Sequence, residues 1–205
     1  VESPSLDLFR ALGMYAITLV IGLVVMGIFY LLIVRLFVKL NPKKFIEGIA
    51  PAQLLAFSTS SSAATLPVTM ERVEEHLGVD EEVASFVLPI GATINMDGTS
   101  LYQAVAAVFI AQAFGMDLGA GTQLTIVMTA TLASIGAAAV PGAGMVMLVI
   151  VLAQAGIPEA GLALIFAIDR PLDMCRTVIN ITGDASVSLL VAKSTGKLSK
   201  HSKKK

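Results

Sequence analysis

A stripe of polar side chains occupies one face of the helix expected near the C-terminal end of the chain. Its members are spaced by four, three, one, three and four residues, and they are Asp169, Asp173, Arg176, Thr177, Asn180 and Asp184. At about 100° per residue, all of them fall within about 100° of the helix circumference. The surrounding sequence is apolar, and an ionised side chain at the centre of a membrane costs at least about 2.5 kcal/mol. Such side chains usually face a cavity or a partner, so we expect the stripe to be a binding surface.

Arg176 and Asp173 are the members of the stripe whose chemistry narrows the choice of ligand. The guanidinium of Arg176 is a planar fork that suits a carboxylate. The carboxylate of Asp173, one turn earlier, can accept hydrogen bonds from an ammonium group. One fixed cation beside one fixed anion favours a zwitterion that carries an additional carboxylate. An ion pair between the two residues is the simpler alternative, but it leaves Asn180 and Asp184 unexplained.

A second polar break lies inside another apolar segment, at residues 95–99. Hard oxygen donors occur both on this segment and on the stripe, at Asn95, Asp97, Asn180 and Asp184. Backbone carbonyls of an unwound helix would complete a cage for a small hard cation. The sequence therefore predicts a site for Na⁺, in which carboxylates offset the cost of dehydrating the ion.

The composition is that of an integral membrane protein. The 205 residues include 56% hydrophobic and only 14% charged residues, with a formal net charge of -1. Soluble domains have about 25% charged residues, and a disordered chain would be poorer in apolar residues. The near-zero net charge argues against nucleic acid as a partner. The single Cys excludes a disulfide framework and a cysteine-based metal site. Since the chain begins with Val and no basic region precedes the first apolar run, we expect a fragment of a longer protein.

The charges along the chain predict how it crosses the membrane. Residues 14–34 form an uncharged run of 21 residues, long enough for one full span, and basic residues follow it. A second basic cluster forms the C-terminal tail. If both basic clusters are cytoplasmic, the number of crossings is odd. The Ser/Thr-rich centre at 58–65 and the Gly/Pro-containing centre at 140–144 favour re-entrant hairpins, so we expect a span, a hairpin, a broken span, a hairpin and a broken span. The second hairpin and broken span would repeat the first pair in the opposite orientation. Such an inverted repeat is typical of transporters with a site near the midplane.

The polar segments together resemble the dicarboxylate/amino acid:cation symporter family, the family of glutamate and aspartate transporters. The resemblance covers about residues 10–195 and depends on three motifs: Thr59 to Pro67, Asn95 to Thr99, and Asp173 to Thr177 followed by Asn180, Gly183 and Asp184. The last two motifs are highly specific in combination, whereas a serine run alone would be weak.

The resemblance implies an all-α integral membrane fold with three membrane-crossing helices, two of them broken, and two re-entrant helical hairpins. The expected elements are an extracellular linker at 1–10, a helix at 11–40, a hairpin at 48–77, a broken helix at 83–115, a hairpin at 121–156, a broken helix at 159–193 and a basic cytoplasmic tail at 194–205. The segment 11–193 would be an elevator-type transport domain that lacks the N-terminal scaffold helices. In the full-length parent these helices would form a homotrimer.

The resemblance also implies roles for individual residues. Arg176 is expected to bind the side-chain carboxylate of the substrate and Asp173 its amino group. The other expected substrate-binding residues are Ser62, Thr99, Val140, Gly144, Thr177 and Asn180. The expected sodium-binding residues are Gly91, Thr93, Asn95, Met96, Asp97, Ser134, Ile135, Ala137, Asn180 and Asp184. The second hairpin tip, 137–144, is expected to be a gate whose backbone groups find partners only when substrate and cation lie beneath it.

The function expected from the resemblance is cation-coupled symport of acidic amino acids across the cell (inner) membrane, by a multi-pass protein with a cytoplasmic C-terminus. The coupling ion is expected to be Na⁺, with H⁺ not excluded, and no organic cofactor is expected. A C4-dicarboxylate substrate is the near alternative, which would leave Asp173 unpaired. An intramembrane protease with Asp97 and Asp184 as its dyad is a second alternative, disfavoured because Asn95 and Asn180 are better cation ligands than catalytic groups. A transport-incompetent fragment is a third.

Overall fold

The computed structural model describes residues 6–199, and over this range the chain folds into helices joined by short connections. The one extended contact in the described range is an isolated antiparallel bridge between Val79 and Leu198. The outer parts of the expected linker at 1–10 and of the expected tail at 194–205 lie outside the described residues. The all-helical class predicted from the sequence is confirmed.

The first helix, α1 (Leu6–Ile33), continues into a π-helical turn, η1 (Val34–Val38), and ends at Lys39, which has a φ of 63°. Its outward side chains are large and apolar; for example, Ile21, Val25 and Phe29 are all more than half exposed. Among the described residues, Leu6–Val38 is the single helix that is long and apolar enough to cross a membrane.

The first helical hairpin consists of α2 (Pro42–Thr59) and α3 (Ser62–Glu75). It starts earlier than expected, because Asn41 caps α2 by accepting a hydrogen bond from the Lys43 amide at 2.9 Å and Pro42 fits the first helical turn. The chain reverses at Ser60, which adopts the left-handed conformation with a φ of 52°. Ser61 then caps α3 by accepting from the Ala64 amide at 3.1 Å.

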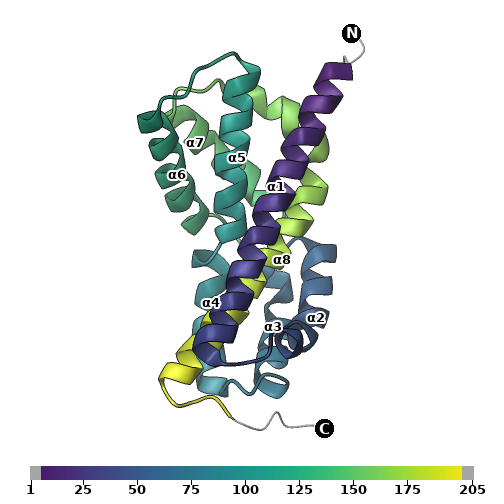
Figure 1. Cartoon of the computed structure of the whole chain (residues 1–205), viewed down its shortest axis with the longest axis vertical. Helices are drawn as coiled ribbons and strands as arrows, with labels where there is room; N and C mark the ends of the chain where they lie inside the picture. The colour runs from purple at the N-terminus through teal and green to yellow at the C-terminus, as the bar shows by residue number, and fades with distance from the viewer. Residues whose placement is uncertain (1–5, 200–205) are drawn as a thin grey trace.

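The second helical hairpin consists of α6 (Ala120–Ile135) and α7 (Ala143–Gln154). Its tip, residues 136–142, ends at Gly142, whose φ of 77° favours glycine. The two hairpins lie at opposite ends of the molecule, with α2 and α3 near the end of α8 and α6 and α7 toward the start of α1 (Figure 1). Their tips approach the same middle region.

The segment between the hairpins is a helix interrupted in its middle. Helix α4 (Glu81–Ile94) and helix α5 (Asp97–Ala113) are separated by Asn95 and Met96, whose ψ angles of 61° and 54° are not helical. The interruption lies at the polar break expected from the sequence.

The last helix differs from the expectation. A 3₁₀ turn, η2 (Glu159–Gly161), leads into α8 (Leu162–Ser194), which is one continuous helix of 33 residues and not a broken one. Pro171 removes one backbone donor without ending the helix. The polar residues of α8 recur at helical spacing, so they face one side and find partners on other elements without unwinding the backbone.

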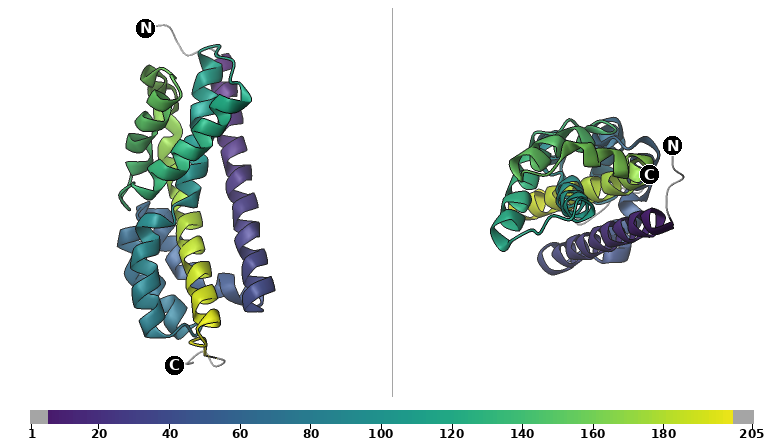
Figure 2. Two further views of the ribbon diagram at one scale, coloured as in Figure 1. Left: turned by 90° about the vertical axis from the view of Figure 1, so that its left-hand side faces the viewer. Right: turned by 90° about the horizontal axis from the view of Figure 1, so that it is seen from above.

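Helix α8 is the centre of the fold, since it packs against α1, α2, α4 and α5. Figure 2 shows α1 running beside α8 on one side of the molecule while the hairpins lie on the other. One apolar core joins α1, α5, α6, α7 and α8 around residues such as Tyr102 and Leu148. A second core joins η1, α2, α3, α4 and α8 around residues such as Phe45 and Leu189. The polar residues of α8 lie between these two cores.

Candidate substrate and cation sites

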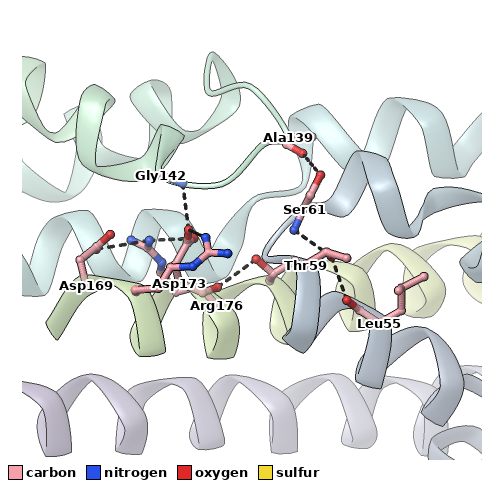
Figure 3. A network of polar contacts seen from close by, with 10 residues as sticks. Leu55, Thr59, Ser61, Ala139, Gly142, Asp169, Asp173 and Arg176 are labelled. Atoms are coloured by element: carbon pink, nitrogen blue, oxygen red, sulfur yellow. Dashed lines mark hydrogen bonds and ion pairs between the residues drawn. The ribbon is translucent and has the colours of Figure 1, made fainter.

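Arg176 is the most buried charged side chain of the stripe, with 1% of its surface exposed. Its Nη2 atom lies 2.8 Å from Asp173 Oδ1 and 3.4 Å from Asp169 Oδ1. A third cation, Arg170, is 3.8 Å from Asp173 but is largely exposed. Two carboxylates therefore balance the charge of the guanidinium (Figure 3). The ion pair that the sequence offered as the simpler alternative is present, yet it uses only one end of the arginine.

Arg176 keeps two nitrogen atoms that can donate to a further acceptor. Its Nε and Nη1 atoms have no hydrogen-bond partner among residues 6–199. Its Cζ atom lies 3.6 Å from the centre of the Tyr102 ring, so the guanidinium is stacked and held in one orientation. Gly144 leaves room beside it, because a Cβ atom there would lie 3.1 Å from Nη1 and 3.1 Å from Thr99 Cγ2. A buried fork with unused donors is chemically suited to a carboxylate.

Asn180 links the stripe to the start of α5. Its Oδ1 accepts from the Gly98 amide at 2.9 Å, and its Nδ2 donates to Thr99 Oγ1 at 3.1 Å. The Thr177 hydroxyl instead donates to the carbonyl of Asp173 in its own helix. The structure thus brings Thr99, Thr177 and Asn180 to the same buried region as Arg176, on α5 and α8.

The second tip already has protein partners for its backbone. The Gly142 amide donates to Asp173 Oδ2 at 2.9 Å, and the Ala139 carbonyl accepts from Ser61 Oγ at 2.8 Å (Figure 3). The Ala63 amide donates to the same carbonyl at 3.3 Å. The expectation that these backbone groups find partners only with bound ligand is therefore wrong, because α8 and the first tip supply them.

Two further residues expected in the substrate site come from the hairpin tips. Ser62 is buried as the first residue of α3. The Val140 side chain is 52% exposed. The backbone of Val140 is part of the tip, and its carbonyl accepts a hydrogen bond from the Ala143 amide. The Val140 side chain is not brought to Arg176.

Asp184 and Asn95 form the centre of the candidate cation region. Asp184 is 3% exposed, and its Oδ1 accepts from Asn95 Nδ2 at 2.9 Å. Gly91 permits this approach, because a Cβ atom there would lie 2.6 Å from Asp184 Oδ1. Within the described range Asp184 has no ion pair with a basic side chain. A buried carboxylate without a cationic partner fits a bound cation.

Asp97 adds a second carboxylate beside the helix break. It accepts a hydrogen bond from the hydroxyl of Tyr30 on α1. The Tyr30 hydroxyl also lies close to Gly183, where a Cβ atom would be 2.6 Å from it and 2.7 Å from Asn95 Nδ2. Gly183 therefore lets α1 and the α4–α5 break approach the backbone of α8 next to Asp184.

The third expected group of cation ligands is only partly assembled. Met96 is buried and packs in one small cluster with Ala137, Ala139 and Met147, which joins the helix break to the second tip. Ser134 is buried, but its hydroxyl donates to Thr131 in its own helix, and Ile135 is exposed by 42%. Thr93 is exposed, and its hydroxyl donates to the Ile90 carbonyl. The Thr93 side chain is therefore not engaged with the tip.

The donor set suits a hard cation better than a transition metal. No group of three or more His, Cys, Asp or Glu side chains that could hold a metal ion occurs in the part of the chain that the structure describes. Around Asp184 the donors are instead carboxylate, amide and backbone oxygens. Oxygen donors with few charges are what hard cations accept.

Three residues of this region were not predicted from the sequence. Tyr102 stacks on Arg176, Tyr30 bonds Asp97, and Gln103, which is fully buried, donates to the Gly144 carbonyl at 3.1 Å. Tyr102 and Gln103 lie three and four residues after Thr99, which is the spacing that places helix residues on one face. That spacing could have placed Tyr102 and Gln103 on the face of Thr99, although it does not identify their partners, and Tyr30 carries no such signal.

Comparison with known proteins agrees with the geometry. The chain matches the sodium:dicarboxylate symporter family over residues 1–194. It is 51% identical over 184 residues to the human excitatory amino acid transporter 5, covering 89% of this chain and 33% of that protein. It is 51% identical over 194 residues to the human excitatory amino acid transporter 3, covering 94% and 37%, and 50% identical over 177 residues to the human excitatory amino acid transporter 2, covering 86% and 31%. The chain thus spans about a third of the length of these relatives.

Proposed function

The chain belongs to the sodium:dicarboxylate symporter family, and on that premise we propose that it is the substrate-binding part of a sodium-coupled symporter of acidic amino acids. The family and the relatives are transporters and not enzymes, so an intramembrane protease is not the reading for Asp97 and Asp184. The relatives compared above are excitatory amino acid transporters. Because this chain spans only about a third of the length of these relatives, we propose that helices outside it complete the transporter.

The observation that carries the proposal is the buried fork of Arg176. Its side chain is 1% exposed, yet Nε and Nη1 lack partners within the described range. Unsatisfied buried donors of a charged group are costly, and a substrate carboxylate bound along one edge of the guanidinium, Nη1 with Nη2 or Nε with Nη2, would satisfy one of them. Asp173 would then accept from the substrate ammonium group at Oδ2, in place of the Gly142 amide. A C4-dicarboxylate has no group for Asp173, which is why an amino acid is the better fit.

Sodium would be held near Asp184, Asn95 and Asn180, one helical turn beyond the substrate region on α8. The ion would supply the positive charge that Asp184 lacks, and its gradient would drive uptake. Because Asn180 also contacts Thr99 and Gly98, ion binding and substrate binding share one side chain. This arrangement supports coupling between the two ligands.

The larger architecture is part of the proposal. We place three crossings in this chain, formed by α1, by α4 with α5, and by α8, and we propose that both hairpins are re-entrant. The C-terminus would be cytoplasmic, and the helices that precede this segment would form a trimeric scaffold. The chain would move against that scaffold as an elevator, with the second tip as its outer gate.

The test is uptake by the full-length transporter in liposomes, with Na⁺ and H⁺ gradients imposed separately and with aspartate, glutamate and succinate as substrates. Aspartate or glutamate uptake that requires the Na⁺ gradient is expected. Arg176→Cys should weaken acidic substrate binding by about 100-fold or more, since each hydrogen bond to a charged group contributes about 1.5–3 kcal/mol. Arg35→Cys is the control, because Arg35 is an exposed arginine on η1, outside the substrate region.

Unchanged aspartate affinity in Arg176→Cys would overturn the assignment of the substrate carboxylate. Uptake driven by an H⁺ gradient alone would leave the substrate site assigned as proposed, but it would show that the coupling ion is H⁺ and not Na⁺. Preference for succinate over both amino acids would favour the dicarboxylate alternative.

A further inference from the structure

We propose that Ser61 is a positioning residue that holds the second hairpin tip closed from the tip of the first hairpin. The proposal rests on the proposed function, since it assigns the second tip as the outer gate. It adds a side chain outside the substrate and cation sites that would set how readily the gate opens when no ligand is bound.

The hydroxyl of Ser61 forms two hydrogen bonds, one as acceptor and one as donor. It accepts from the Ala64 amide at 3.1 Å and so caps its own helix α3, and it donates to the Ala139 carbonyl of the second tip at 2.8 Å. A serine hydroxyl has one donor and two acceptor positions, so both bonds form at the same time. Ser61 is 7% exposed, and its cross-hairpin bond is therefore shielded from competing water.

Ser61 differs from the other hydroxyls of the first tip. The Ser58 and Thr59 hydroxyls donate to the Leu55 carbonyl of their own helix. The Ser60 hydroxyl is buried without a partner among residues 6–199. Of the four hydroxyls at 58–61, Ser61 is the one for which the structure records a hydrogen bond across to the second hairpin (Figure 3).

The bond to Ala139 is compatible with a bound substrate, whereas another bond of the second tip is not. The Gly142 amide occupies Asp173 Oδ2, which the substrate ammonium would take over in the proposed function. The Ser61 bond involves neither Asp173 nor Arg176. It can therefore close the gate both before and after binding, and it prepares the closed conformation for the ligand.

The experiment measures gate opening by thiol labelling. Ala143, at the start of α7, is changed to Cys in a Cys175→Ser background of the full-length transporter in liposomes, freed of any other accessible thiol. An impermeant thiol reagent is added from outside, first without Na⁺ and substrate and then with Na⁺ plus aspartate. Four further variants are compared: Ser61→Ala, Ser61→Asp, Ser61→Thr and Ser58→Ala.

Ser61→Ala should speed ligand-free labelling by about 3- to 10-fold, the effect of one hydrogen bond. Ser61→Asp should do the same, because its carboxylate can still cap α3 but cannot donate to Ala139. Ser61→Thr retains the donor and should label at the parent rate, as should Ser58→Ala. Na⁺ plus aspartate should reduce the difference in labelling rate between the variants.

Three results would overturn the proposal. Equal ligand-free rates in all variants would mean that the bond does not hold the gate. Fast labelling in Ser61→Ala with parent-like labelling in Ser61→Asp would assign the effect to the helix cap alone. Fast labelling in Ser61→Thr would show that the site tolerates no change and that the hydroxyl is not the cause. If Na⁺ plus aspartate fails to slow labelling in the parent background while Ser61→Ala still accelerates it, the proposed function fails and the role of Ser61 stands.

Discussion

At the residue scale, the buried charges of α8 differ in how they are balanced. Arg176 has two carboxylates within 3.4 Å, whereas Asp184 has an amide partner, Asn95, and no described basic side chain. An imbalance of this kind is costly in a membrane unless a ligand corrects it. The proposed sodium ion is the ligand that corrects it at Asp184.

Asp184→Asn is expected to weaken sodium binding, because it removes the negative charge and keeps the shape of the side chain. The sodium concentration for half-maximal aspartate binding should rise by about tenfold or more, as the contribution of about 1.5–3 kcal/mol per charged contact implies. Substrate affinity at fixed sodium should fall, and added sodium should restore it, since linkage is reciprocal. Binding titrations at several sodium concentrations provide the measurement.

Asp80→Asn is the control for this substitution. Asp80 caps α4 by accepting from the Glu82 amide at 3.1 Å, and asparagine caps a helix equally well. The control should therefore leave sodium dependence unchanged. If Asp184→Asn behaves in the same way as the control, Asp184 is a structural residue and the cation region is wrong.

At the element scale, the second tip and the first turn of α7 are held from three sides. Ser61 binds the Ala139 carbonyl, Asp173 binds the Gly142 amide, and Gln103 binds the Gly144 carbonyl. The partners are the N-cap residue of α3, a residue of α8 and a residue of α5. The position of the tip therefore depends on all three helices at once.

Gly144→Ala should weaken substrate binding without unfolding the protein. The added methyl group would press on Arg176 Nη1 and Thr99 Cγ2, both 3.1 Å from the ideal Cβ position. Overpacking typically costs about 1–3 kcal/mol, so aspartate affinity should fall by about 5- to 100-fold. Gly136→Ala in the same hairpin is the control, because its nearest neighbour lies at an ordinary 3.6 Å. Isothermal titration calorimetry measures the aspartate affinity of both variants. Equal affinities in Gly144→Ala and Gly136→Ala would show that Gly144 does not belong to the substrate site.

The elements were predictable where a local signal and the packing agree. The break at Asn95 and Met96 was predictable because polar residues interrupt an apolar run. The same reasoning failed for α8, whose polar residues keep helical spacing and find partners on α5, in the α4–α5 break and in the second tip. The helical spacing of these residues predicts a continuous helix, and it should have counted for more than their polarity.

Several site residues were not predictable from type alone. Tyr102 and Tyr30 resemble core or lipid-facing filler, since a ring in an apolar segment usually packs. Their contacts with Arg176 and Asp97 depend on how α5 and α1 rotate against α8. Such pairings are set by tertiary packing, which the sequence of one helix does not contain.

At the scale of the whole molecule, the chain that follows α8 returns to the connection between α3 and α4. The Asp80 amide donates to the Lys197 carbonyl at 3.1 Å, and the Ser199 amide donates to the Gly78 carbonyl at 2.8 Å. Lys197 also pairs with Glu82, and this hydrogen bond raises the pKa of the Lys197 ammonium group. Since the folded pKa is the higher one, the contribution of this pair is complete below the ordinary lysine pKa and is lost as the pH rises through the raised value.

These contacts define a strap, residues 195–199, that ties the α3–α4 connection, at the base of the first hairpin, to the end of α8. The proposed elevator movement requires both hairpins and α8 to move as one body. The Ser61 bond joins the two hairpins at the centre, and the strap joins α8 to the first hairpin at the C-terminal end of the molecule (Figure 1). Loosening the strap should therefore lower the stability of the whole body, and it should do so without touching the substrate region.

Gly78→Ala tests the strap against a matched glycine. Gly78 and Gly156 have similar positive φ values, 79° and 68°, so alanine at either position costs about 1–2 kcal/mol of backbone strain. At Gly78 a Cβ atom would also lie 2.8 Å from the Ser199 carbonyl oxygen, whereas at Gly156, which is outside the strap, it would meet nothing within 4 Å. Gly78→Ala should therefore lower the melting temperature by about 2–6 °C more than Gly156→Ala does, as the loss of one or two hydrogen bonds predicts. Circular dichroism at a helix wavelength in lipid nanodiscs measures both, and equal melting temperatures would show that the strap contributes nothing to holding the first hairpin on α8.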